Sequence, residues 1–154
     1  MKNNMRFRKL FFYSPILFAF LLSFNSNAQT WQWAKSYGGL NTVSAGIRNI
    51  DSNGNLFVVG GFGGQCYFQT DTLWTFGNAH GMFLAKLDNS GNEIWIKQPG
   101  GSSLSGLQER FTTAALDEVN SAIYISGSYS GTLSMDGHSV TSATTDHFFS
   151  QVRS

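Results

Sequence analysis

Short apolar runs separated by turn residues form the main pattern of the chain beyond residue 28. The runs are rich in aromatic and β-branched residues, and the breaks between them consist of Gly, Asn, Asp and Ser. Short runs of this kind are typical of strands, and no stretch of useful length shows the 3.6-residue spacing of an amphipathic helix. The pattern therefore predicts an all-β fold of antiparallel strands.

The predicted strands follow these runs in chain order. The run 56–62 is apolar on both faces, as expected of a strand that is covered on both sides. Asp51-Ser52-Asn53-Gly54-Asn55 predicts a tight turn after the second strand, because Asn and Gly tolerate positive φ. A small hairpin is expected around Tyr67-Phe68 and Leu73-Trp74. Strands are predicted at 30–37, 45–51, 56–62, 82–88, 93–98, 110–117, 122–129 and 148–152.

The chain also contains an internal repeat. Pieces of its first half recur in the second half at a nearly constant distance in the sequence, which indicates an array of similar units. The differences in residue number are 62 for Trp33 and Trp95, 66 for Asp51 and Asp117, 67 for Phe57 and Tyr124, and 65 for Phe83 and Phe148.

Each repeat unit contributes four consecutive antiparallel strands, and such a unit repeated around an axis is a β-propeller blade. The first repeat is expected at about 45–98 and the second at about 110–152, with an outer strand at 30–37 before them. The predicted fold class is thus all-β, with antiparallel four-stranded meander repeats of β-propeller blade type in an incomplete propeller of about two blades.

These residues resemble a known family, the bacterial secreted β-propeller repeats of the SBBP type. The resemblance covers most of residues 31–154 and is weaker in the second repeat, where Gln151 stands in place of Lys86. It implies a secreted or surface protein without shared catalytic residues. The motifs that carry it are Trp33-Ala34-Lys35, Gly38-Gly39, Asp51 to Asn55, Phe57 to Phe62, and Phe83-Leu84-Ala85-Lys86-Leu87-Asp88 through Trp95.

Propellers close with about four to eight blades, whereas this chain holds the strands of two. Three arrangements are open. The remaining blades belong to a longer protein, the ring closes by self-association, or the two units pack as a small sandwich.

The segment 1–28 has the composition of a secretory signal. Basic residues at 2–9 precede an apolar run at 10–22, and Ser26-Asn27-Ala28 resembles a cleavage site. This apolar run is shorter than the roughly 20 residues that a membrane-spanning helix needs. Cleavage after Ala28 is expected, which leaves no stable membrane span and places the protein in the periplasm, on the outer surface or outside the cell. An uncleaved N-terminal anchor is the alternative.

Loss of this leader changes the net charge of the protein. Six basic and nine acidic residues lie beyond residue 28, so the net charge is 6 − 9 = −3, compared with +1 for the whole chain. No basic stripe remains, which argues against nucleic-acid binding.

Exposed aromatic side chains are the candidates for ligand contact. We expect stacking platforms for sugars at Trp74, Trp31 and Tyr129. Trp74 is the best candidate, because it lies in residues 63–80, a long and variable excursion between two predicted strands. Trp33 and Trp95 share a repeat position and are expected to pack instead.

Other reactive residue types predict no cofactor, metal or catalytic site. Asp51-x-Asn53-x-Asn55 resembles the start of a calcium loop, but it lies between consecutive strands and a turn is expected. His80, His138 and His147 are expected in solvated loops, although His80 and His147 nearly match across the repeat. Cys66 is the only cysteine and is expected to be buried.

The combination of a leader and a repeat predicts an exported, non-enzymatic binding or adhesion scaffold. Its expected partners are glycan or protein ligands at the cell surface, together with the remaining blades or further copies that close the ring. Two alternatives stay open: blades of a larger carbohydrate-active enzyme, or a fragment without independent activity.

Overall fold

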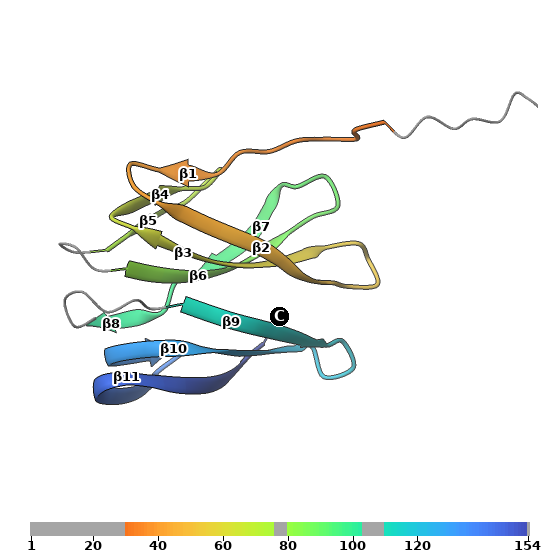
Figure 1. Ribbon diagram of the computed structural model, residues 1–154. Coiled ribbons are helices and arrows are strands. Elements are labelled where there is room, and N and C mark those ends of the chain that lie inside the picture. Colours follow the sequence, from red (N-terminus) through yellow and green to blue (C-terminus); the bar gives the residue numbers. More distant parts are fainter. Residues whose placement is uncertain (1–29, 76–79, 103–109, 154) are drawn as a thin grey trace, which may run out of the picture. The chain divides into compact units, whose positions relative to one another are not determined.

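The computed structural model describes residues 30–75, 80–102 and 110–153 and shows antiparallel sheets in this part of the chain, without a helix (Figure 1). The predicted all-β antiparallel class is therefore confirmed. Residues 33–153 lie in one compact unit, whereas residues 30–32 belong to a separate N-terminal unit. The expected leader and its cleavage site lie outside the described residues. Within them, no helix has the length and apolar character needed to cross a membrane.

The first sheet contains four strands that pair in the order in which they occur along the chain. Each strand is antiparallel to its neighbour, and the connections β2–β3 and β6–β7 are tight Asp-x-x-Gly-Asn turns. Its strands are β2 (Val43–Ile50), β3 (Leu56–Gly63), β6 (His80–Leu87) and β7 (Glu93–Lys97).

The second sheet is built around one long strand. The first half of β10 (Ala122–Met135) pairs with β9 (Arg110–Asp117), and its second half pairs with β8 (Gly100–Ser102). On its other side β10 pairs with β11 (His138–Arg153) along nearly its whole length.

The β10–β11 hairpin is longer than the predicted strands 122–129 and 148–152, because both strands continue into residues 130–147 between them. Asp136 and Gly137 join the two strands with φ angles of 46° and 84°. Positive φ at both central residues is the geometry of a two-residue hairpin turn that matches strand twist.

A third, small sheet lies against the first one (Figure 1). It contains β1 (Gly38–Gly39), β4 (Gln65–Tyr67) and β5 (Thr72–Trp74) in the order β1-β4-β5. The hairpin β4–β5 confirms the one expected around Tyr67-Phe68 and Leu73-Trp74.

The predicted outer strand at 30–37 is wrong, since no residue of this segment takes part in a backbone ladder. Alternate side chains contact the β6–β7 turn instead. Trp33 Nε1 donates a hydrogen bond to the carbonyl oxygen of Asn89 (2.8 Å), and Lys35 Nζ donates one to Asn92 Oδ1 (3.0 Å). The segment runs beside a turn, which offers side-chain and carbonyl acceptors instead of a strand edge.

Two apolar layers hold the sheets together. One lies between the first and second sheets and includes Phe57, Leu84, Ile123 and Phe148. The other lies between the first sheet and the small sheet and includes Phe62, Phe83 and Cys66. The first sheet is therefore covered on both faces, which explains the two-sided apolar character of β3.

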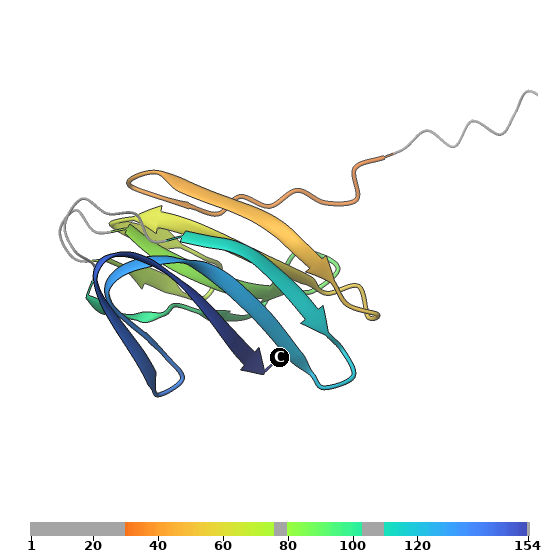
Figure 2. The ribbon, with the colours of Figure 1, turned by 60° about the horizontal axis from the view of Figure 1, so that its bottom comes forward.

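Strand β2 of the first sheet and strand β9 of the second sheet lie side by side. β2 and β9 contact each other and run in the same direction in both Figure 1 and Figure 2. Asn49 Nδ2 donates a hydrogen bond to the carbonyl oxygen of Ala114 (2.9 Å), and the backbone N–H of Ser52 donates to the Glu118 carboxylate (3.1 Å). These polar links reinforce the apolar layer between the sheets.

The two sheets repeat one another in register. Gly60 lies opposite Phe83 in the first sheet, and Gly127 lies opposite Phe148 in the second. Each glycine makes room for the aromatic ring: a Cβ atom on Gly60 would lie 2.5 Å from Phe83 Cε1, and one on Gly127 would lie 2.7 Å from Phe148 Cε1. In this register, β10 corresponds to β3 and β11 to β6.

Candidate functional site

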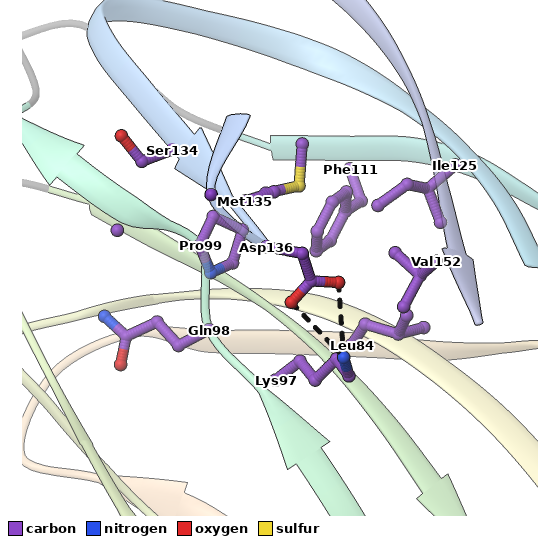
Figure 3. A pocket seen from close by; sticks show the side chains of 12 residues that line it. Leu84, Lys97, Gln98, Pro99, Phe111, Ile125, Ser134, Met135, Asp136 and Val152 are labelled. Carbon is purple, nitrogen blue, oxygen red and sulfur yellow. Dashed lines mark hydrogen bonds and ion pairs between the residues drawn. The ribbon is translucent and has the colours of Figure 1, made fainter. Parts of the chain in front are cut away.

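A cavity of about 210 Å³ lies between the two large sheets and is drawn in Figure 3. Its floor is apolar and comes from both sheets, with Leu84 from β6 and Phe111, Ile125 and Val152 from β9, β10 and β11. These positions face the cavity because alternate residues of a strand point to the same side of the sheet.

An ion pair lies at this cavity (Figure 3). Lys97 Nζ, at the end of β7, lies 3.3 Å from Asp136 Oδ2, at the tip of the β10–β11 hairpin. Both side chains are largely exposed, so the pair stabilises the fold by at most about 1 kcal/mol. Gln98 turns away toward the small sheet, where its amide accepts a hydrogen bond from the Trp74 N–H and donates one to the Trp74 carbonyl oxygen.

This cavity is small for a ligand site. Pockets for small molecules usually measure about 300–1,000 Å³, and its apolar floor offers no nucleophile or acid–base pair. We interpret it as a packing gap between two sheets.

A second hollow lies on the outer face of the second sheet, away from the first sheet. It measures about 350 Å³ and is lined mainly by Ala115, Tyr124, Phe149 and Gln151. Phe149 is 88% exposed, and Tyr124 is about half exposed. A sheet face with two large exposed rings is an apolar surface that lacks a cover in the described part of the chain.

Three aspartates organise the tight turns. The Asp51 carboxylate accepts hydrogen bonds from the backbone N–H groups of Asn53 (3.0 Å) and Asn55 (2.8 Å) and from Asn55 Nδ2 (2.9 Å). Asp88 receives the same set from Ser90 and Asn92, and Asp117 receives a reduced set from Asn120. The predicted turns are confirmed.

These hydrogen bonds keep the carboxylates charged. Backbone and side-chain hydrogen bonds from Asn92 lower the pKa of Asp88, and those from Asn120 lower the pKa of Asp117. Burial acts to raise the pKa of Asp51, but hydrogen bonds from Asn55 and Lys86 outweigh it and the pKa lies below its ordinary value. The carboxylates therefore act as acceptors that fix the turns.

The first repeat contains an ion pair that the second repeat lacks. Lys86 Nζ lies 3.3 Å from Asp51 Oδ2 and 5.0 Å from the centre of the Phe57 ring. The side chains of Lys86 and Asp51 are only 17% and 9% exposed. At the register position of Lys86, the second sheet has Gln151, opposite Tyr124.

The three aromatic residues predicted to contact ligand lie in different surroundings. Trp74 on β5 is 58% exposed, and Trp31 is exposed in the N-terminal segment. Tyr129 is 5% exposed and packs edge-on against Phe148, so the prediction of an exposed platform there is wrong. Since Tyr129 aligns with the buried Phe62 in the repeat, its side chain fills the layer between the sheets.

The two tryptophans of the shared repeat position pack against the first sheet. Trp95 is half-buried and packs edge-on against Phe57 with ring centres 6.2 Å apart. Trp33 lies over the β6–β7 turn, where a Cβ atom on Gly91 would approach its ring to 2.8 Å.

The three histidines lie on strands instead of loops, and they do not converge. His80 begins β6 opposite Gly63, His138 begins β11, and His147 lies opposite Ser128. The position in the first sheet that is equivalent to His147 is occupied by Met82, which lies opposite Gly61 as His147 lies opposite Ser128. The near match of His80 and His147 in the sequence is therefore not a structural match. Within residues 30–75, 80–102 and 110–153, no group of three His, Cys, Asp or Glu side chains is placed to hold a metal ion.

Cys66 is a free thiol on β4 and is fully buried, as predicted. Burial raises the pKa of this thiol, because the apolar surroundings disfavour the thiolate.

The exposed ring of Phe149 is the feature of this surface that the sequence analysis missed. Phe148 and Phe149 are adjacent on one strand, so their side chains point to opposite faces of the sheet. This adjacency was the available signal for an apolar outer face.

Comparisons of the chain with protein-family models, curated proteins and solved structures find no match. The resemblance to the repeat family therefore stays a prediction.

Proposed function

We propose that the protein is an exported, non-enzymatic repeat scaffold of the β-propeller type, whose sheets stack face to face and which binds ligands at the cell surface or outside the cell. One observation carries this proposal. The first sheet buries one of its faces against the second sheet. The second sheet has an equivalent face, with its residues in the same register, and that face is exposed.

The equivalence holds residue by residue. Val59 lies opposite Leu84 in the first sheet, and Ser126 lies opposite Phe149 in the second. The side chains of Val59 and Leu84 are 2% and 1% exposed because the second sheet covers them. In a stack of repeats, Tyr124, Ser126 and Phe149 would be covered in the same manner.

The occupant that fits this face is a further sheet of the same repeat, outside the two described sheets. It would present the apolar positions that Ile123, Ile125, Phe148 and Val152 present to the first sheet. The first sheet of a second copy of this chain is a less suitable cover for the Tyr124 and Phe149 face. The equivalent face of that sheet, with Leu56, Val58, Phe83 and Leu87, is already packed against the small sheet.

The polar groups of the described residues support a scaffold role. The carboxylates of Asp51, Asp88 and Asp117 accept hydrogen bonds within their turns. The gap between the sheets has an apolar floor, and the outer hollow of the second sheet is lined mainly by apolar surface. Trp74, exposed on β5 at the edge of the small sheet, and the exposed Trp31 are the remaining aromatic candidates for contact with a glycan or protein ligand.

Light scattering on the purified chain tests which partner covers the outer face. We expect a monomer, because the face of the first sheet that would match the Tyr124 and Phe149 surface is already packed against the small sheet. A dimer that Phe149→Ser dissociates, while Val119→Ser leaves it intact, would show that a second copy is the occupant and would overturn this part of the proposal.

Export and the absence of catalysis are tested separately. Mass spectrometry of the protein from culture medium and from cell fractions should find a chain that begins at residue 29. Recovery of the uncleaved chain from the cytoplasm would contradict export, and hydrolysis of a glycan or peptide by purified protein would contradict the scaffold role.

A further inference from the structure

On the basis of the proposed function as a ligand-binding scaffold, we propose that the outer face of the small sheet binds a neutral oligosaccharide of β-linked glucose units. The small sheet of β1, β4 and β5 packs its inner face against the first sheet (Figure 1). Cys66 and Leu73 are buried on that inner face, so the residues on either side of them point outward. The outward residues of β4 and β5 are Gln65, Tyr67, Thr72 and Trp74.

Two exposed aromatic rings lie on neighbouring strands of this outer face. The Trp74 side chain is 58% exposed, and Tyr67 is 44% exposed. Gln65 lies opposite Trp74 and Tyr67 lies opposite Thr72. The two rings therefore occupy diagonal positions, at which large side chains on adjacent strands still act together. Tyr and Trp rings have a large apolar surface that packs against the C–H groups of a sugar ring, and two such rings can contact more than one sugar unit.

Hydrogen bonds hold both aromatic residues in place. The Tyr67 hydroxyl donates a hydrogen bond to Gln65 Oε1 (2.7 Å). The side-chain amide of Gln98 accepts a hydrogen bond from the Trp74 N–H (3.3 Å) and donates one to the Trp74 carbonyl oxygen (2.8 Å). Gly38 of β1 lies opposite Tyr67, and a Cβ atom there would meet no atom within 4 Å, so β1 leaves space beside the ring. Residues that are fixed before binding lose little conformational freedom when the ligand arrives.

The composition of the outer face favours a neutral, hydroxylated ligand. Its four outward side chains are uncharged, so a charged ligand would form no ion pair with them. The amide of Gln65 and the hydroxyl of Thr72 are groups that hydrogen-bond the hydroxyls of a sugar. β-Linked glucose units fit the aromatic rings well, because their substituents are all equatorial and both faces of each sugar ring expose C–H groups.

A protein strand fits this small sheet less well than a ligand on its face. A further strand would have to pair with the outer edge of β5. Side chains already occupy this edge, because Gln98 bonds both backbone groups of Trp74. The Glu93 carboxylate also accepts a hydrogen bond from Thr70 Oγ1 (2.8 Å), just before β5.

The second repeat has an equivalent of the small sheet. Gly39 of β1 lies opposite Cys66 on β4, and Gly101 of β8 lies opposite Leu133 on β10. The second half of β10 and the first half of β11 therefore correspond to β4 and β5.

The aromatic rings are absent from this equivalent. Its four corresponding positions all carry hydroxyl groups, and Thr141 takes the place of Trp74. The residues are Thr132, Ser134, Ser139 and Thr141. The two rings are therefore no part of the packing that the repeats share, as expected of a binding site that one repeat adds to a common scaffold.

Isothermal titration calorimetry with cellohexaose, glucose and a hexamer of galacturonate tests this site. We expect cellohexaose to bind, glucose to bind much more weakly because it contacts one ring, and the galacturonate hexamer to bind much more weakly because its carboxylates find no partner. Trp74→Thr, which introduces the residue found at position 141, should reduce the cellohexaose affinity by about tenfold or more. Tyr67→Ser, which introduces the residue found at position 134, should also reduce it.

Phe149→Ser is the matched control, because it removes an exposed ring from the second sheet and leaves the small sheet intact. It should leave the affinity for cellohexaose unchanged. Circular dichroism and the unfolding temperature establish that the three variants are folded.

Three results would overturn the proposal: no binding of cellohexaose, equal affinities for cellohexaose and either glucose or the galacturonate hexamer, or equal losses of affinity in Trp74→Thr and Phe149→Ser. Light scattering and mass spectrometry test stacking and export without a sugar. A failure of this site is therefore distinguishable from a failure of the proposed function.

Discussion

Leu84 and Phe149 occupy the same register position in the two sheets, yet the Leu84 side chain is 1% exposed and the Phe149 side chain is 88% exposed. The second sheet covers Leu84, whereas the structure describes no cover for Phe149. This difference between equivalent positions is the basis of the stacking proposal.

The energetic consequence can be measured with alanine variants of both residues. Leu84→Ala should destabilise the chain by about 2–5 kcal/mol, because it leaves a cavity between the sheets. Phe149→Ala should change the free energy of unfolding by less than about 0.5 kcal/mol, as for other exposed positions. Urea unfolding of the purified chain gives both values, and equal losses would show that Phe149 is also packed.

Gly60, which lies opposite Phe83, should not tolerate a side chain. Gly60→Ala would place a Cβ atom 2.5 Å from Phe83 Cε1 and against the Ser44 carbonyl oxygen, so the ring and the strand must shift. We expect a loss of about 1–3 kcal/mol. Gly38→Ala is the control, because a Cβ atom there would meet no atom within 4 Å. Equal unfolding midpoints in urea for the two variants would contradict this packing.

The ion pair of Lys86 and Asp51 should stabilise the first repeat more than an exposed pair does. Lys86→Gln introduces the residue found at the equivalent position 151 and removes a hydrogen bond from the largely buried Asp51. We expect a loss of about 1–3 kcal/mol on thermal or urea unfolding. Lys97→Gln breaks the exposed pair with Asp136 and should cost less than about 1 kcal/mol. The reverse order of losses would count against a structural role for Lys86.

The aspartate turns should make the fold sensitive to acid. The pKa values of Asp51, Asp88 and Asp117 lie below their ordinary values in the folded chain. Their stabilising contribution is therefore fully present above the ordinary aspartate pKa of about 4, and it is lost as the pH falls from there through the lower values of the folded chain. The unfolding temperature should drop between pH 5 and pH 2.

A single variant assigns part of this effect to one turn. Asp88→Asn should lower the unfolding temperature at pH 6 and reduce the further drop on acidification, because its side chain cannot accept the full set of hydrogen bonds from Ser90 and Asn92. Asp146→Asn, at an exposed position of β11, is the control. If both variants lose stability on acidification as the unmodified chain does, the turn at Asp88 does not contribute.

The repeat made the central strands predictable. Its sequence offsets place 56–62 and 122–129 on β3 and β10, and they place Phe83 and Phe148 on β6 and β11. Short runs of apolar residues mark these strands in the sequence, and a turn that begins with an aspartate precedes each of 56–62 and 122–129. The same offsets align Tyr129 with Phe62, so the burial of Tyr129 was available from the repeat itself.

Other features could not be read from the apolar pattern. The ends of the β10–β11 hairpin are polar and pair partly through hydroxyl groups, as Thr132 Oγ1 with Thr141 Oγ1 and Ser134 Oγ with Ser139 Oγ. Such strands lack the apolar alternation that marks the others. Arg48 of β2 and Arg110 of β9 line one hollow because these two strands contact each other, and neither strand predicts this alone.

Site-specific photocrosslinking at position 149 tests the stacking of repeats most directly. Phe149 is replaced by the photoreactive p-benzoylphenylalanine in the cell that makes the protein, and Val119, which is 94% exposed in a turn, serves as the control position. We predict that position 149, and not position 119, crosslinks to a strand with alternating apolar residues that belongs to a further repeat of this type. Equal crosslinking at the two positions, or a crosslink from position 149 to the same face of a second copy, would contradict the account.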